Sequence, residues 1–162
     1  MKGKKLLELG AGSGLISFIA ESKGADVTAS DLSKVAVKGL QYNKEHLHSR
    51  ITITESDLFE KIPLQAFDFI IINPPYYPHN PITDPQLAWY CGEHHEYFQK
   101  LFSQLSERKS LIDKIVMVLS EDCDILTIRK IAEQYNFELK ECMRKKIWWE
   151  WNYIFEIEKT AR

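Results

Sequence analysis

The stretch KKLLELGAGSGLISFIAES, residues 4–22, decides the fold that this chain is expected to adopt. It opens on an apolar run typical of a buried strand and closes on a segment, Leu15–Ser22, with the apolar spacing of a helix. Between them lies the turn LELGAGSG, whose glycines Gly10, Gly12 and Gly14 allow backbone conformations that other residues rarely adopt. A strand, a glycine-rich turn and a helix in this order indicate a ligand site at the helix N-terminus.

The remaining sequence alternates between strand-like and helix-like segments. We expect further strands over residues 26–30, 51–54, 67–72 and 114–119, and helices over residues 33–48, 86–105 and 125–135. This alternation predicts an α/β protein with a mainly parallel sheet. Residues 137–148 and 153–158 are rich in aromatic and β-branched residues, which predicts an antiparallel hairpin at the C-terminus. The length predicts a single domain, residues 1–162.

The composition argues against several classes of protein. The formal net charge of −2 argues against a broad positive surface for nucleic acid, although it allows a local basic patch. The three cysteines are few and widely spaced, so we expect no disulfide framework and a reducing, cytoplasmic environment. No apolar run approaches the roughly 18 residues that cross a bilayer, so we expect no membrane association.

A second motif, the tetrapeptide Asn73-Pro74-Pro75-Tyr76, follows the apolar run FDFIII. An amide or exocyclic amine is a poor nucleophile because its lone pair is delocalised into the attached π-system. The Asn73 side-chain carbonyl and the Pro74 main-chain carbonyl can accept the two N–H groups of such a nitrogen, and Tyr76 offers a flat face for stacking. Two prolines stiffen the segment and leave its carbonyls free. The alternative is an ordinary turn at a strand end, where Asn and Pro are common.

The glycine turn distinguishes between two classes of nucleotide cofactor. Dinucleotide enzymes carry G-x-G-x-x-G after a strand, but Leu15 occupies the position of the third glycine of that pattern. Here the spacing is G-x-G-x-G, and Glu8 precedes it. An acidic side chain suits the ammonium group of an amino acid better than it suits a pyrophosphate. Together with the tetrapeptide, the turn predicts S-adenosylmethionine as the cofactor, with a nicotinamide dinucleotide as the alternative.

Acidic residues also follow the next two predicted strands. Asp31 ends the second strand, where a carboxylate can accept hydrogen bonds from both ribose hydroxyls. Asp57 follows the third strand and can accept from the adenine amine, with Leu58 packing beside the ring. Each aspartate taken alone favours a helix cap or a turn residue. Two of them at the sheet edge that carries the glycine turn favour cofactor binding, because ligands in open α/β sheets bind at that edge.

These motifs occur in the order found in a known family. The chain resembles the HemK-like branch of S-adenosylmethionine-dependent N-methyltransferases, which act on the glutamine side-chain amide of release factors. The matching stretches are LELGAGSG, ASDLS with Asn43, ESDLF, FDFIIINPPY, AWYCGEHHEYFQKLF and, near the C-terminus, KKIWWEWNYIFEIEK. The resemblance implies a Rossmann-like methyltransferase fold: a mainly parallel seven-stranded sheet with helices on both faces and the cofactor at its carboxyl edge.

The resemblance also implies what each residue of the site does. By this resemblance, the methionine end of the cofactor contacts Gly10, Gly12 and Gly14, and the ribose binds to Asp31. The adenine contacts Asp57 and Leu58, and the acceptor nitrogen is held by Asn73, Pro74 and Tyr76. Similar enzymes with this tetrapeptide act on glutamine amides, on adenine in DNA or transfer RNA, and on guanine in ribosomal RNA. The expected acceptor is a protein glutamine of the release-factor type, and a nucleic-acid base is the alternative.

The sequence departs from this family at two places. The family usually begins with a recognition domain and a helix before the first strand, whereas almost nothing precedes Lys4. We therefore expect a sheet face that is partly bare, or that a partner chain or a dimer covers, or a chain that is part of a longer protein. After the prolines the glutamine enzymes usually read G-G-x-D-G, whereas this chain has Cys91-Gly92-Glu93-His94-His95. Both departures bear on the release-factor assignment and leave the methyl-transfer core intact.

Three alternative interpretations accompany these expectations. Cys91, His94 and His95 fit no zinc spacing and fall where a helix is predicted near the acceptor loop, so no metal is expected. The segment RKKIWWEW, residues 144–151, mixes positive charge with aromatic side chains, as nucleic-acid binders do. We expect instead a hairpin edge whose tryptophans pack on the sheet. The third alternative is a non-catalytic, cofactor-binding partner subunit, which the missing helix favours and the intact tetrapeptide disfavours.

Overall fold

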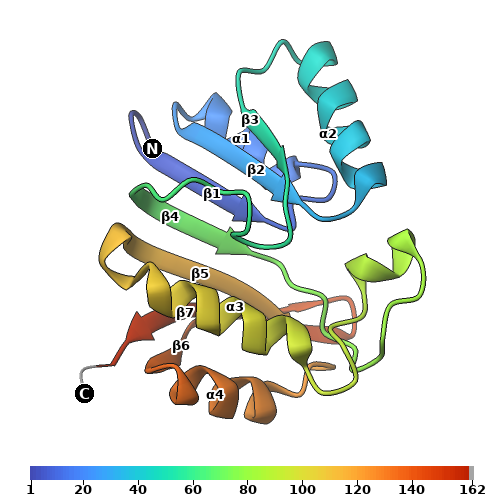
Figure 1. The fold of residues 1–162 in the computed structure, drawn as a ribbon, viewed down its shortest axis with the longest axis vertical. Coiled ribbons are helices and arrows are strands. Elements are labelled where there is room, and N and C mark those ends of the chain that lie inside the picture. The colour runs from blue at the N-terminus through green and yellow to red at the C-terminus, as the bar shows by residue number, and fades with distance from the viewer. Residues whose placement is uncertain (161–162) are drawn as a thin grey trace.

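The computed structural model describes residues 1–160, in which helices flank a central sheet (Figure 1). Within this range seven strands pair in the order β3-β2-β1-β4-β5-β7-β6. The strands are β1 (Lys5–Leu9), β2 (Asp26–Asp31), β3 (Thr52–Glu55), β4 (Phe67–Ile72), β5 (Ile112–Ser120), β6 (Phe137–Ile147) and β7 (Glu150–Lys159). The first five strands pair in parallel, whereas β7 is antiparallel to both β5 and β6. The predicted mainly parallel sheet with an antiparallel C-terminal hairpin is confirmed.

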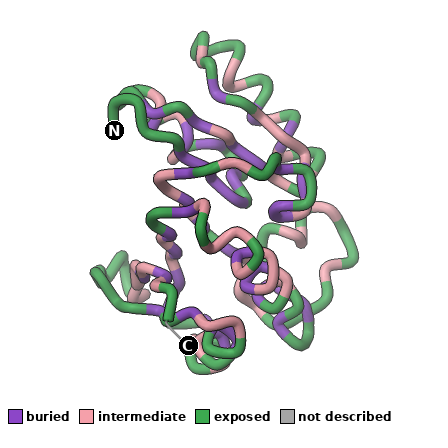
Figure 2. Tube along the Cα trace, turned by 60° about the vertical axis from the view of Figure 1, so that its left-hand side comes forward, coloured by how far each residue is buried: buried purple, intermediate pink, exposed green. Residues whose placement is uncertain are grey.

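Helices cover both faces of the sheet, as expected. They are α1 (Leu15–Ser22), α2 (Lys34–His46), α3 (Glu96–Glu107) and α4 (Ile125–Gln134), with short 3-10 turns η1 (Asp84–Ala88) and η2 (Lys109–Leu111). In Figure 1, α3 and α4 lie in front of the sheet, and their apolar side chains share a core with β4, β5 and β7. On the opposite face Ala20 of α1 and Leu40 of α2 pack with Leu6 and Val27. Buried segments therefore run through the centre of the molecule and exposed ones around it (Figure 2).

Local sequence signals explain where these helices lie and begin. In α3 the apolar residues recur every three or four positions and form one buried face, made by Phe98, Leu101, Phe102 and Leu105. The backbone N–H of Ala36 donates to the Ser33 hydroxyl at the start of α2, at 3.1 Å, and that of Thr127 donates to the Asp124 carboxylate at the start of α4, at 3.0 Å. Such caps satisfy backbone donors that the first helical turn leaves free. None of the helices in residues 1–160 is long and apolar enough to cross a membrane.

The predicted helix over residues 86–105 is wrong in its first half. Only the part from Glu96 onward is α-helical, because the preceding segment, which begins in the 3-10 turn η1, pairs with the chain after β4. The Trp89 carbonyl accepts hydrogen bonds from the backbone N–H groups of Tyr76, at 3.1 Å, and Tyr77, at 2.9 Å. Gly92 then adopts a φ of 92°, which interrupts any helical path. This pairing folds the segment between β4 and α3 back over the carboxyl edge of the sheet.

The C-terminal hairpin turns more tightly than the sequence predicts. β7 begins at Glu150, so only Trp148 and Trp149 separate the two strands. These tryptophans are 84% and 82% exposed, so the expectation that they pack on the sheet is wrong. Trp151 is half-buried, and the Arg144 guanidinium lies 5.7 Å from the centre of its ring. The hairpin therefore ends in two exposed aromatic rings beside a positively charged strand.

The sheet face that carries α1 and α2 is incompletely covered near its middle. Phe69 and Ile71 of β4 and Val116 and Val118 of β5 are only half-buried there. On the opposite face the apolar residues of the same strands are buried completely or nearly so: Ile70, Ile72, Ile115, Met117 and Leu119. A partly bare face is what the sequence predicts, and its coverage by a partner chain or a dimer stays a prediction.

Candidate active site

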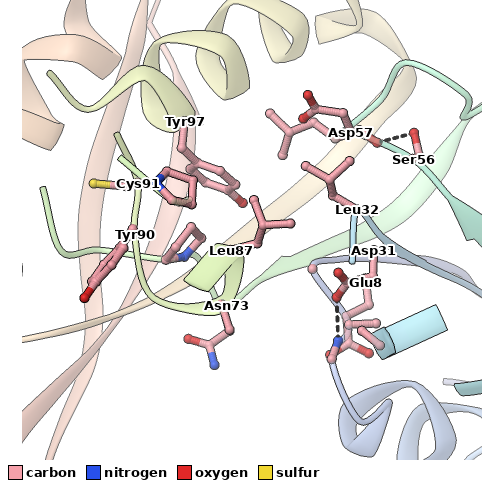
Figure 3. A pocket seen from close by; sticks show the side chains of 18 of the residues that line it. Glu8, Asp31, Leu32, Ser56, Asp57, Asn73, Leu87, Tyr90, Cys91 and Tyr97 are labelled. Carbon is pink, nitrogen blue, oxygen red and sulfur yellow. Dashed lines mark hydrogen bonds between the residues drawn. The ribbon is translucent and has the colours of Figure 1, made fainter. Parts of the chain in front are cut away.

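A cavity of about 680 Å³ opens at the carboxyl edge of the sheet. Its walls come from the glycine turn after β1, the residues that end β2 and β3, and the segment that runs from β4 into α3 (Figure 3). This volume lies within the range of about 300–1,000 Å³ that is typical of small-molecule sites. Of the predicted site residues, those that line the cavity are Glu8, Gly10, Gly12, Asp31, Asp57, Leu58 and Asn73.

The glycine turn is held open by backbone contacts to β2. The N–H groups of Gly10 and Ala11 both donate to the Ser30 carbonyl at 2.9 Å. Gly12 has a φ of 54°, and a Cβ at that position would meet no atom within 4 Å, so its surface faces open space. Asn43 of α2 supports the turn by donating from Nδ2 to the Ser13 carbonyl at 3.2 Å. The turn therefore exposes bare backbone to the cavity.

Gly14 is packed against the core at the start of α1 and does not line the cavity. It has a φ of 79° where α1 begins, and a Cβ there would lie 2.5 Å from Leu40 Cδ2 and 2.7 Å from Phe18 Cε2. We expect Gly14→Ala to destabilise the fold by about 2–4 kcal/mol, the sum of a left-handed backbone and an overpacked core. The matched change Gly12→Ala should cost about 1 kcal/mol, because it adds only the backbone strain. Urea unfolding of both variants measures their free energies of unfolding, and equal losses of stability in the two would contradict this packing argument.

Glu8 is the buried carboxylate of the site. Its Oε2 accepts hydrogen bonds from the Ser17 N–H, at 2.9 Å, and from the Ser17 hydroxyl, which fixes the start of α1. Burial raises the pKa of the Glu8 carboxyl above its ordinary value; hydrogen bonds from Ser17 oppose this shift, and the charge of Asp31 adds to it. The ionised form is therefore costly unless a positive group enters the cavity beside it.

This raised pKa gives a pH-dependent prediction for Glu8→Gln. A raised folded-state pKa means that Glu8 contributes stability below the pKa of an unfolded glutamate, about 4.3, and loses it as pH rises through the folded pKa. Gln has no charge to desolvate and keeps an acceptor for Ser17. We therefore expect the difference in stability between Glu8→Gln and the unaltered protein to shift in favour of Glu8→Gln as the pH rises from 4 to 7.5. Denaturant midpoints at both values test this, and a relative loss on raising the pH would contradict the argument.

Asp31 connects the glycine turn with the start of α2. Its Oδ2 accepts from the Gly12 N–H at 2.8 Å, and its Oδ1 accepts from the Ser33 N–H at 2.9 Å. A carboxylate has about four acceptor positions, so two bonds leave capacity for the hydroxyl groups of a ligand. Asp31 is thus both a turn residue just before the Ser33 cap of α2, as the alternative interpretation has it, and part of the cavity wall.

Asp57 and Leu58 form the wall that lies beyond Asp31. Leu58 is buried and has a φ of 51°, and its carbonyl accepts from the Ser56 hydroxyl at 2.9 Å. Asp57 Oδ2 accepts from Lys100 Nζ of α3 at 2.5 Å, and Lys100 also contacts Glu60 Oε1 at 2.5 Å. Because Asp57 Oδ1 has no such partner, one oxygen of this carboxylate stays available to a ligand.

The tetrapeptide lies where β4 ends, next to the glycine turn. Asn73 is exposed and lines the cavity, and its backbone oxygen would lie 3.8 Å from a Cβ on Gly10. Pro74 is buried, whereas Pro75 lines the cavity. The Tyr76 ring is half-buried against the main core, and burial raises the pKa of its hydroxyl. Asn73 thus shares the cavity with the glycine turn, and the roles given to Pro74 and Tyr76 stay predictions.

The segment between β4 and α3 supplies a wall that the sequence motifs do not specify. Asp84 contacts the start of α2, where it accepts from the Ser33 hydroxyl and from the Lys34 N–H at 3.3 Å. Tyr97 and Lys100, one helical turn apart on α3, also line the cavity. Sequence reasoning missed both because it placed them inside a longer helix. The sequence did contain a signal that the helix starts later: Gly92, a helix breaker, lies inside the predicted helix.

Comparison with known proteins agrees with this geometry. The family model for the methyltransferase small domain matches residues 1–90, more than half of the chain. The chain belongs to the methyltransferase small domain family. Its class is that of S-adenosylmethionine-dependent methyltransferases with a Rossmann-like fold.

Individual relatives carry two kinds of name. A protein of Methanocaldococcus jannaschii named a putative N5-glutamine methyltransferase is 42% identical over 79 residues, covering 48% of this chain and 40% of the relative. A protein of Shewanella loihica named a tRNA1(Val) (adenine(37)-N6)-methyltransferase is 36% identical over 89 residues, covering 49% of this chain and 37% of the relative. The matches with the curated relatives thus span well under two thirds of those proteins; for a bifunctional methyltransferase of Rickettsia prowazekii the share is 15%.

Solved structures confirm the fold over nearly the whole chain. Mtq2 of E. cuniculi, in a complex with Trm112 described as methylating the termination factor eRF1, superposes with a TM-score of 0.71 and 21% identity, covering 99% of this chain and 87% of that one. The T. thermophilus 16S rRNA N2 G1207 methyltransferase, bound to AdoMet and guanosine, has a TM-score of 0.66 and 18% identity, covering 99% and 38%. At this identity the likeness concerns the fold.

Proposed function

We propose that this chain transfers the methyl group of S-adenosylmethionine to a planar nitrogen, and that residues 1–162 act as one catalytic domain. The observation that carries this proposal is the placement of Asn73 at the end of β4, in the same cavity as the glycine turn after β1. An acceptor held by Asn73 would therefore face whatever the glycine turn holds. The membership of the methyltransferase small domain family supports the same conclusion.

The cavity residues fit the parts of this cofactor in order. Glu8, buried and short of a positive partner, suits the ammonium of the methionine moiety. The open surface of Gly12 leaves room for its chain. Asp31 has acceptor capacity for the ribose hydroxyls, and Asp57 Oδ1 for the adenine amine, with Leu58 beside the ring. None of these cavity residues is suited specifically to a pyrophosphate, so a nicotinamide dinucleotide has less support as the cofactor.

In the reaction that follows, the chain's residues act on the acceptor nitrogen. When bound, the cofactor supplies a sulfonium methyl group, a strong electrophile that leaves a neutral thioether behind. Asn73 Oδ1 and the Pro74 carbonyl would accept the two N–H groups of the acceptor and so direct its lone pair towards that methyl. One nitrogen proton then leaves to solvent, so no buried general base is required. Burial raises the pKa of the nearby Cys91 thiol to about 11, which keeps it neutral and removes it as a competing nucleophile.

We propose a glutamine side-chain amide of a protein, as in release factors, as the acceptor. Two relatives support this choice: the M. jannaschii protein described above and a release factor glutamine methyltransferase of Bordetella pertussis, 39% identical over 75 residues, 44% of this chain and 28% of that protein. A partner chain is consistent with the half-covered sheet face, and the similar Mtq2 occurs in a complex.

A nucleic-acid base is the second candidate acceptor. The observation that favours it is the hairpin tip, where Trp148 and Trp149 are exposed beside Arg144, Lys145 and Lys146. Aromatic rings interleaved with positive charge are the usual surface for single-stranded nucleic acid. The S. loihica relative, named for its action on a tRNA adenine, supports the same reading.

One experiment separates the two acceptors. The chain is incubated with a cell extract and S-adenosylmethionine labelled in the methyl group, and the products are digested separately with protease and with nuclease. The protein with Asn73→Ala serves as the blank. Loss of macromolecular label only with protease supports the glutamine proposal. Loss only with nuclease supports the base, and no label above the blank contradicts an active methyltransferase.

A further inference from the structure

The N-terminal part of α3 forms a wall of the cavity opposite Asp31 and Asp57. Figure 3 shows the Tyr97 ring entering from this wall, with its hydroxyl directed into the space between Leu87, Leu32 and Asp57. The ring is held in place by packing against the main core and edge-on against Phe98, with ring centres 5.3 Å apart. The Tyr97 N–H donates to the Cys91 carbonyl at 2.9 Å, which fixes the backbone at this point. The direction of the hydroxyl is therefore set by the fold.

The Tyr97 hydroxyl is enclosed and has no hydrogen-bond partner among residues 1–160. Leaving a buried polar group unpaired costs about 1–3 kcal/mol, and Tyr and Trp polar groups usually find a partner when buried. Neither neighbouring carboxylate fills this role. Asp31 accepts from Gly12 and Ser33, and Asp57 accepts from Lys100. A group that points into a cavity without a protein partner is suited to a partner that the cavity binds.

The electrostatic surroundings fix which role this hydroxyl plays. Burial raises the pKa of Tyr97, and the negative charges of Asp31 and Asp57 raise it further. The phenol therefore remains protonated and is a donor at any physiological pH. Carboxylates such as Asp31 and Asp57 accept hydrogen bonds from the hydroxyl and amine groups of a ligand, but when ionised they donate none to the ligand's own acceptor atoms. The Tyr97 phenol supplies such a donor beside the two carboxylates.

We infer that the Tyr97 hydroxyl donates a hydrogen bond to the nucleoside half of the bound cofactor, to a ring nitrogen of the adenine or an oxygen of the ribose. The inference rests on the cofactor site proposed above. It places Tyr97 opposite the two carboxylates that hold the same half, so the nucleoside is bound from both walls. Glu8 and the glycine turn, which the proposed function assigns to the methionine half, line another part of the same cavity.

Tyr97→Phe tests this inference, because it removes the hydroxyl and keeps the ring. Titration calorimetry of the full chain would measure the Kd of S-adenosylhomocysteine and of 5′-methylthioadenosine, which lacks the amino-acid end. We expect both Kd values to rise by the same factor, roughly 3- to 10-fold for one hydrogen bond. The matched control is Tyr42→Phe, on α2 and 61% exposed, which should change neither value.

Melting without ligand separates binding from folding. The Tm of ligand-free Tyr97→Phe should equal or exceed that of the unaltered protein, since the lost hydroxyl has no partner there. Unchanged Kd values would overturn the inference and leave the proposed function standing. A loss for S-adenosylhomocysteine alone would place the hydroxyl at the amino-acid end and overturn it too. Failure of the unaltered chain to bind either ligand would overturn the cofactor site itself.

Discussion

Asn73→Ala is expected to lower methyl transfer at least 100-fold while leaving the Kd of S-adenosylhomocysteine within a few-fold of its original value. The expectation follows from the position of Asn73, which is exposed at the end of β4 and lines the cavity next to the glycine turn. In the proposed function its amide oxygen would hold the acceptor nitrogen, and a misplaced or poorly oriented nucleophile costs factors of this size. Single-turnover methyl transfer measures the rate and titration calorimetry measures the Kd, both on the same preparation.

A neighbouring asparagine provides a matched control for this variant. Asn80 is also exposed and lines the same cavity, but its Nδ2 donates to Glu93 at 3.3 Å, away from the tetrapeptide. Asn80→Ala should therefore retain most of the activity. If Asn73→Ala kept its activity, Asn73 would not hold the acceptor. If it lost cofactor binding instead, its task would belong to the cofactor site.

Asp31→Ala should do the reverse and weaken cofactor binding by about 1–3 kcal/mol, or roughly 5- to 150-fold, the scale of hydrogen bonds to a charged group. Two losses combine in this variant. The ribose hydroxyls lose their acceptor, and the Gly12 N–H loses a bond of 2.8 Å that holds the glycine turn. Equilibrium binding of S-adenosylhomocysteine measures the sum.

The control for Asp31 lies at the other end of the same strand. Asp26 begins β2 and is exposed, far from the carboxyl edge, so Asp26→Ala removes an equal charge without touching the cavity. It should leave the Kd unchanged. Affinity that survives Asp31→Ala would refute the ribose assignment and leave Asp31 only its role as a turn residue between β2 and α2.

The parts of the fold that the sequence predicts well are those in which local signals agree with packing. The helix Leu15–Ser22 and the strand Phe67–Ile72 have the predicted bounds, because a glycine turn starts the one and the segment Asn73-Pro74-Pro75 ends the other. The expected placement of Glu8, Asp31 and Asp57 at one edge follows from parallel strand order alone, and the cavity contains all three.

The parts that sequence reasoning missed depend on contacts between distant segments. The sequence prediction extends the helix through residues 86–95 despite Gly92, whereas in the structure the Trp89 carbonyl bonds to the chain after β4. Tyr97 and Lys100 therefore enter the cavity wall from a helix whose start the sequence misplaces. At the hairpin, the apolar character of Trp148 and Trp149 suggests burial, but a two-residue turn leaves no surface for them to cover.

The central claim is that the methyl group goes to a planar nitrogen, and identifying the labelled atom tests it most directly. The labelled acceptor from the extract reaction is hydrolysed, and the fragment that carries the label is identified by mass spectrometry. The account predicts a nitrogen-bound methyl: methylamine released from a glutamine amide, or an N-methylated base if the acceptor is nucleic acid. Label recovered on oxygen, sulfur or carbon would contradict the role given to Asn73 and the account built on it.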